Sequence, residues 1–220
     1  MTDTAAHKPS PWTAPETPPG AIDGLGLILR PFTPADATAM FEAVDRSRES
    51  LLPWLPWAKS GHRSIESSRD TIERFIASMH DPINPAYRDS GYVTGIFDAA
   101  DGRLLGGTGF NRIDAATATA ETGYWLSAEA RGRGVVTSAV RLNISLGFTP
   151  QTKGGLGWRR IVIYASAANE RSCLVPDRIG LRREVHATRD RWVDGIGWTD
   201  TLGWAVLAEE WDCATHTLRS

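Results

Sequence analysis

A glycine-punctuated basic turn is the most chemically informative feature of this sequence. A strand pattern that ends near Ser127 leads into the turn Arg131-Gly132-Arg133-Gly134, and helical spacing follows as far as Phe148. The first N–H groups of a helix have no helical acceptor, and the macrodipole adds roughly half a positive charge there. An anionic cofactor is the expected occupant. A turn whose glycines serve packing alone is the alternative. The candidate binding residues are Arg131, Gly132, Arg133, Gly134, Val135, Val136 and Thr137.

Two other glycine-rich segments do not predict phosphate sites. The segment 105–109 lies inside a predicted strand and no helix follows it, so its glycines indicate a bulge or a close approach of backbones. The connection 149–158 contains Gly154, Gly155 and Gly157 and is predicted to be a mobile loop. Because no Gly-Lys-Ser/Thr follows these glycines, the loop is not an ATP P-loop.

The composition is typical of a globular protein of one domain. The chain has 220 residues, of which 41% are hydrophobic and 23% charged. The net charge of −2 argues against non-specific nucleic-acid binding, and no apolar run is long enough to span a membrane. The N-terminus does not resemble a signal peptide. Cys173 and Cys213 show no metal-ligand spacing, so we expect no metal site and a cytoplasmic protein.

Periodicity and turn residues predict a mixed α/β sheet. Residues 1–23 form a proline-rich arm that should be flexible or lie on the surface, residues 24–212 a single domain, and residues 213–220 a tail. Strands are predicted at 25–32, 92–97, 103–113, 119–127, 160–165, 184–194 and 198–207, and helices at 33–44, 64–79, 134–148 and 169–180.

Two proline-containing segments have local consequences. Residues 51–57 hold two prolines and Trp54 and Trp57, which predicts a rigid loop. That loop is either a lid packed over the core or a wall of a substrate cleft. Pro176 has no N–H to donate to the carbonyl of Ser172, four residues earlier, so the last helix should be irregular near Ser172.

The order of elements, the run from Arg131 to Ala139, the segment Asn169-Glu170-Arg171-Ser172 and the stretch 178–184 together resemble the GNAT superfamily of acyl-CoA N-acyltransferases. The RimJ/RimL branch is the most similar, and the resemblance covers residues 25–212. It implies a mixed, mostly antiparallel twisted sheet flanked by helices, with a V-shaped splay between strands 119–127 and 160–165 for the pantetheine arm of CoA. Within this branch, the chain looks like a bacterial N-succinyltransferase, which uses succinyl-CoA instead of acetyl-CoA.

The resemblance also implies roles for individual residues. The turn from Arg131 would hold the CoA pyrophosphate, although Val136 stands where the pattern prefers a smaller residue. Asn169 would face the pantetheine, and Ser172 would protonate the departing thiolate. The tyrosine that many members use for this step is missing, because its position is held by Pro176. The backbone N–H of Leu126 or Ser127 would donate to the oxyanion.

The general base is less well defined. Glu121 is the first candidate, because strand alternation places it on one face with Gly123 and Trp125. A carboxylate paired with an arginine is its alternative role. Asp190 is a weaker candidate. A succinyl group would add a carboxylate that needs a cationic partner, for which Arg30, Arg112 and Arg191 are available.

The sequence therefore predicts a CoA-dependent N-acyltransferase in which an amine attacks acetyl-CoA or succinyl-CoA directly, within a ternary complex. The acceptor would be a protein N-terminus, a lysine or a small amine, and the sequence indicates neither nucleic-acid nor membrane partners. Homo-oligomerisation is left open. A GNAT-shaped protein that binds acyl-CoA without turnover is the main alternative. A nucleotide-binding regulator is a second alternative, although a Walker lysine is absent.

Overall fold

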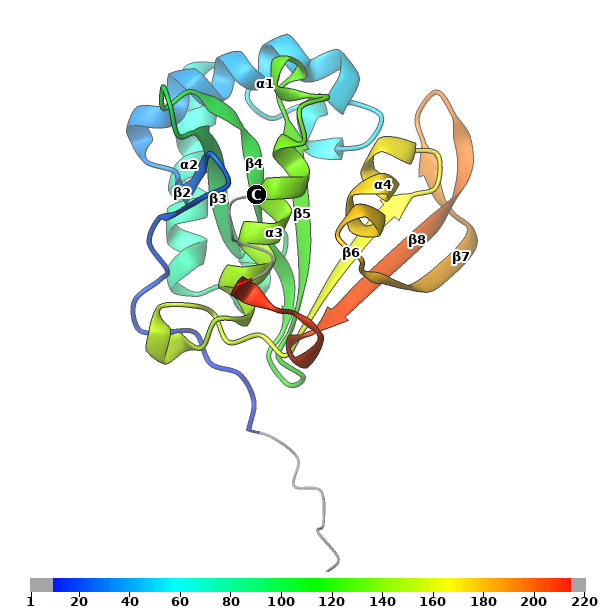
Figure 1. Cartoon of the computed structure of the whole chain (residues 1–220). Helices are drawn as coiled ribbons and strands as arrows, with labels where there is room; N and C mark the ends of the chain where they lie inside the picture. The colour runs from blue at the N-terminus through cyan, green and yellow to red at the C-terminus, as the bar shows by residue number, and fades with distance from the viewer. Residues whose placement is uncertain (1–9, 215–220) are drawn as a thin grey trace, which may run out of the picture.

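The computed structural model describes residues 10–214, which form an eight-stranded sheet flanked by helices (Figure 1). Every predicted helix and strand is present, but the first helix begins later than predicted and continues to Leu51. The short strand at 22–24, at the end of the predicted arm, was not predicted. The strands are β1 (Ile22–Gly24), β2 (Leu27–Pro31), β3 (Tyr92–Asp98), β4 (Leu104–Asp114), β5 (Thr119–Leu126), β6 (Arg160–Ser166), β7 (Arg182–Val193) and β8 (Gly197–Leu207). The helices are α1 (Ala37–Leu51), α2 (Ile65–His80), α3 (Val135–Phe148) and α4 (Glu170–Arg178), with short 3-10 turns between elements.

The sheet opens between its two central strands. Its strand order is β1-β2-β3-β4-β5-β6-β8-β7, and every neighbouring pair is antiparallel except β5 and β6. These two parallel strands pair only from Thr119–Arg160 to Glu121–Val162. Beyond Glu121 they diverge, and Figure 1 shows them meeting at one end and separating toward the other. The predicted V-shaped splay is thus confirmed, and β5 presents an unpaired edge to the gap.

Side-chain alternation explains how helices cover both faces of the first half of the sheet. Leu29, Ile96 and Leu105 point to one face and pack with Ala139 and Leu142 of α3. Phe97 and Leu104 point to the other face, where they pack with α1 and α2. Helix α4 lies against β6 on the same side as α3 (Figure 1). No helix within residues 10–214 is long and apolar enough to cross a membrane.

The proline-rich arm packs against the domain at Trp12, in agreement with the expectation that it lies on the surface and not with the expectation that it is flexible. The Trp12 side chain is only 8% exposed and stacks on Trp158, with ring centroids 4.1 Å apart. Its Nε1 donates to the carbonyl of Leu156 at 2.7 Å. Apolar contact and an indole hydrogen bond outweigh the low order that the proline content suggests. Residues 1–9 and 215–220 lie outside the described part of the chain, so the rest of the arm and most of the tail stay predictions.

Trp12→Phe should lower the free energy of unfolding by about 1–2 kcal/mol, because it removes the indole donor and part of the stacked ring. The Leu156 carbonyl keeps a second donor, Gln151 Nε2 at 3.3 Å, which limits the loss. Urea denaturation measures the change. Trp192→Phe is the matched control, since Trp192 is 59% exposed and its replacement should change stability by less than about 0.5 kcal/mol. Equal effects of the two substitutions would contradict the anchoring role of Trp12.

The connection 149–158 is also packed, so the prediction of a mobile loop is wrong. Leu156 and Trp158 are buried, and their backbone N–H groups donate to the carbonyls of Leu146 and Gly147. The glycines of this connection serve tight turns, as shown by Gly154 at φ 80°. The glycines of β4 permit close backbone approach, as predicted: a Cβ on Gly106 would lie 2.1 Å from the Trp125 carbonyl oxygen.

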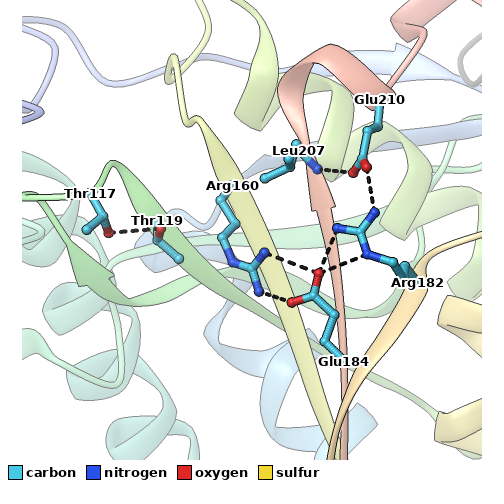
Figure 2. Close-up of polar contacts among 7 residues, drawn as sticks. All are labelled: Thr117, Thr119, Arg160, Arg182, Glu184, Leu207 and Glu210. Carbon is cyan, nitrogen blue, oxygen red and sulfur yellow. Dashed lines mark hydrogen bonds and ion pairs between the residues drawn. The ribbon is translucent and has the colours of Figure 1, made fainter. Parts of the chain in front are cut away.

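A chain of ion pairs joins the C-terminal elements (Figure 2). Arg160 of β6 reaches across β8 to pair with Glu184 of β7. Arg182 Nη2 lies 2.7 Å from the same carboxylate, and Arg182 Nη1 lies 2.5 Å from Glu210 in the turn after β8. Hydrogen bonds from Arg160 and Arg182 lower the pKa of Glu184 to about 2. The network thus joins the turn after β8 to the edge strand β7.

Glu184→Gln should reduce stability by about 1 kcal/mol near neutral pH, the upper end for a solvent-exposed network. Because the folded-state pKa of Glu184 is depressed from 4.5, its contribution is complete above pH 4.5 and disappears as the pH falls through about 2. Urea midpoints of the wild type and variant should therefore converge over that window. Glu73→Gln, at an exposed position of α2, is the control and should give a pH-independent difference close to zero.

Candidate active site

The turn before α3 has the geometry of an anion site. Gly132 and Gly134 adopt φ values of 77° and 75°, in the left-handed region that favours glycine. Gly134 is the N-cap residue and provides no side chain to cap the helix. Ser138 N–H is the first to bond within the helix, to Gly134 O at 3.1 Å. The N–H groups of Val135, Val136 and Thr137 are therefore left without helical acceptors at an accessible position beside the splay.

Arg131 fixes this turn to its surroundings. Its Nη2 donates to Ser50 Oγ at 2.7 Å and to the Leu126 carbonyl at 3.3 Å. Burial and the charge of nearby Arg171 lower the pKa of Arg131. An anion bound at this position would counter the repulsion between the two guanidinium groups. Arg133 is exposed and extends the positive charge of the turn.

The open edge of β5 distinguishes the two predicted oxyanion donors. Ser127 N–H donates to the Leu105 carbonyl at 2.8 Å, so it points toward β4 and cannot serve the gap. The prediction of Ser127 N–H as an oxyanion donor is therefore wrong. Backbone groups alternate in direction along a strand, which turns the N–H of Leu126 toward the gap. The contact of Arg131 with the Leu126 carbonyl on that side agrees with this direction.

Ser172 is held at the start of α4 by polar contacts to its N–H, its carbonyl and its hydroxyl. Asn169 is the N-cap residue, and its Oδ1 accepts from Ser172 N–H at 3.3 Å. The carbonyl of Ser172, which Pro176 leaves without a helical donor, accepts from Tyr124 Oη at 2.9 Å. Ser172 Oγ also lies 3.3 Å from Tyr124 Oη. The carbonyl left without a donor by Pro176 was predicted from the sequence, but its partner Tyr124, 48 positions earlier, was not.

Glu121 lies where the pairing of β5 with β6 ends, and it is mostly buried. Its Oε2 is 3.4 Å from Arg112 Nη1, and Arg112 Nε is 3.2 Å from Asp89. The arginine pairing that was the alternative role of Glu121 is therefore present. Burial raises the pKa of Glu121, while the charges of Arg112 and Arg191 oppose the rise. Asp190 lies on the exposed part of β7, at the irregular pairing between Ala187 and Arg191.

The loop 52–63 is held rigid next to Trp125 of β5. Arg48 is buried, and its guanidinium donates to the carbonyls of Ala58 at 2.5 Å, Gly61 at 3.0 Å and His62 at 2.6 Å. The Trp57 ring packs edge-on against Trp125, with centroids 5.9 Å apart. The loop thus lies beside the strand face that carries Glu121 and is packed onto it through Trp57.

Two of the arginines considered for a succinyl carboxylate are already paired. Arg30 makes two contacts with Asp36, at 2.8 and 2.7 Å, and lies over the Phe97 ring on the far part of the sheet. Arg112 is shared by Asp89 and Glu121. Among residues 10–214, no three His, Cys, Asp or Glu side chains lie close enough together to hold a metal ion.

Comparisons with known proteins agree with this geometry. The family model described as Acetyltransferase (GNAT) domain matches residues 26–182. The putative ribosomal N-acetyltransferase YdaF of Bacillus subtilis is 29% identical over 186 residues, which cover 84% of this chain and 93% of YdaF. Among solved structures, a probable acetyltransferase is 28% identical, with a TM-score of 0.72 over 87% of this chain and 98% of its own. RimL, a ribosomal L7/L12 alpha-N-protein acetyltransferase in complex with CoA, shares the fold, with 21% identity, a TM-score of 0.70 and coverage of 85% and 97%.

Proposed function

Because this chain belongs to the GNAT acetyltransferase family, we propose that it transfers an acetyl group from acetyl-CoA to the N-terminal amine of a protein. One observation carries the proposal most directly. The N-terminus of α3, which has Gly134 as its N-cap residue and no side-chain cap, lies beside the gap between β5 and β6. In the proposal, the turn from Arg131 holds the pyrophosphate, and the unpaired edge of β5 together with Asn169 faces the pantetheine.

The chemistry of the transfer assigns each candidate residue a role. The acceptor nitrogen attacks the thioester carbonyl carbon, and the N–H of Leu126 donates to the oxygen as it gains negative charge. Glu121 accepts the proton that the nitrogen loses, directly or through water. The C–S bond then breaks, and Ser172 Oγ donates a proton to the CoA thiolate and takes one back from solvent. Glu121 releases the amine proton to solvent, which returns both side chains to their starting states. No covalent enzyme intermediate is needed in this ternary-complex mechanism.

The charges around Glu121 favour an α-amine over a lysine or a polyamine. At pH 7, the neutral form costs about 1.4 kcal/mol for an α-amine of pKa near 8, and about 4.6 kcal/mol for a lysine of pKa near 10.4. The positive charges of Arg112 and Arg191 act on Glu121 and would repel a polycation there. YdaF and RimL are named for ribosomal acceptors, so ribosomal protein N-termini are the first class to test.

Acetyl is the donor group that the arginine contacts favour. A succinyl carboxylate would need a free cation, whereas Arg30 and Arg112 are already engaged by carboxylates. The third arginine, Arg191, already acts on the Glu121 carboxylate. In a thiol-release assay, we therefore expect acetyl-CoA to support a higher kcat/KM than succinyl-CoA. A preference for succinyl-CoA would refute this part of the proposal.

The central experiment combines calorimetry with a thiol-release assay on the full chain. Calorimetry should show binding of CoA and acetyl-CoA and no comparable binding of ATP. Thiol release should occur with a peptide that has a free N-terminus. It should be much slower with a version of this peptide whose N-terminus is acetylated and whose only amine is one lysine side chain. It should also be much slower with spermidine. Tight acetyl-CoA binding without thiol release from any amine would support the binding-protein alternative instead.

A further inference from the structure

Pro176 creates an unusual hydrogen-bonding requirement in α4. In a regular helix the N–H of residue 176 would donate to the carbonyl of Ser172, but proline has no N–H. The structure satisfies this carbonyl from outside the helix, through Tyr124 Oη at 2.9 Å. The same phenol oxygen is 3.3 Å from Ser172 Oγ, so Tyr124 contacts both the carbonyl and the hydroxyl of Ser172.

Tyr124 reaches Ser172 from the other side of the splay. It lies in β5 beyond Glu121, where β5 no longer pairs with β6, while Ser172 belongs to the helix that follows β6. The contact is therefore a side-chain bridge between two elements that diverge in the backbone. Burial raises the pKa of Tyr124, so its hydroxyl stays protonated and remains a hydrogen-bond donor.

We propose that Tyr124 is a positioning residue that fixes the first turn of α4 and the hydroxyl of Ser172, and that Pro176 makes this bridge necessary. The inference rests on the proposed function, in which Ser172 protonates the thiolate. Without the phenol, the Ser172 carbonyl loses its donor, and Ser172 Oγ loses the partner that limits its rotation. The protonation of the thiolate then becomes slower, while the turn from Arg131 continues to bind CoA.

Tyr124→Phe tests the bridge in the full chain, with acetyl-CoA and the acceptor peptide that gives the fastest thiol release. We expect kcat to fall about tenfold, the value of one oriented hydrogen bond, and KM for acetyl-CoA to change by less than about twofold. Tyr92→Phe is the matched control. Tyr92 Oη is buried without a hydrogen-bond partner among residues 10–214, so removal of this hydroxyl should leave kcat unchanged.

The rescue by a second substitution separates positioning from direct proton donation. Pro176→Ala restores an N–H that can donate to the Ser172 carbonyl. In the Tyr124→Phe background it should therefore recover at least half of the lost kcat. If Tyr124→Phe leaves kcat at the wild-type value, or if the double variant stays as slow as Tyr124→Phe, the positioning role is refuted.

A second measurement keeps this inference separate from the proposed function. If the wild type releases no thiol with any amine, the proposed function fails, and hydrogen exchange of residues 169–178 then tests the bridge alone. Exchange should be faster in Tyr124→Phe than in the wild type and slower again in the double variant. Equal exchange in all three proteins would overturn the bridge itself.

Discussion

Gly134→Glu is expected to lower the affinity for CoA by at least about a hundredfold. Gly134 has a φ of 75°, and the N–H groups that follow it are the proposed pyrophosphate donors. A glutamate at this position strains the backbone and places a negative charge against a dianionic group. Together the two effects need to supply only about 2.8 kcal/mol for a hundredfold change. Isothermal titration with CoA measures the loss.

Two further variants divide the effect into strain and charge. Gly134→Ala adds the strain without the charge and should weaken CoA binding by about tenfold at most. Gly102→Glu is matched in conformation and charge, because Gly102 has a φ of 72° and open space around it, but it lies in the turn between β3 and β4. It should leave the affinity unchanged. An unaltered affinity of Gly134→Glu would remove the turn from the site.

The fold could be predicted largely because its signals are local. The cap of α2 at Ser64, the change to a period of two in β3 and the glycine turn before α3 all act within a few residues. The splay was predicted through family resemblance. It could not have been derived from periodicity, because the strand pattern of β5 continues unchanged past Glu121, where pairing with β6 ends.

The contacts that sequence reasoning missed are long-range. Trp12 reaches Leu156 across 144 positions, and no local pattern distinguishes it from a surface residue of a proline-rich arm. Ser127 failed as an oxyanion donor because strand pairing, and not residue type, decides which way a backbone N–H points. For Tyr124, a signal did exist: Pro176 left a carbonyl without a donor, and such a group, when buried, requires a partner from elsewhere.

Glu121→Gln should lower kcat about a hundredfold, the lower range for loss of a general base. Glutamine keeps the shape of the side chain but cannot accept the amine proton. The thiol-release assay with the acceptor peptide measures the loss, and calorimetry should show unchanged affinity for CoA. Glu129→Gln is the control, since Glu129 is exposed in the turn after β5 and pairs with Arg46 at 3.3 Å. Similar rates for both variants would leave Glu121 as a structural carboxylate.

The pH profile tests the environment of the same carboxylate. A general base acts when ionised, so kcat should rise with pH through the pKa of Glu121, which burial holds above its ordinary value of 4.5. Three charged groups face it: Arg112 from β4, Arg191 from β7 and Asp89 from the loop before β3. Arg112→Gln removes a charge that favours the ionised form, so the rising limb should move to higher pH. If Glu121 is only a structural carboxylate, Arg112→Gln should lower the free energy of unfolding and leave the rising limb of the kcat profile in place. A shift of that limb to lower pH would contradict the expected direction.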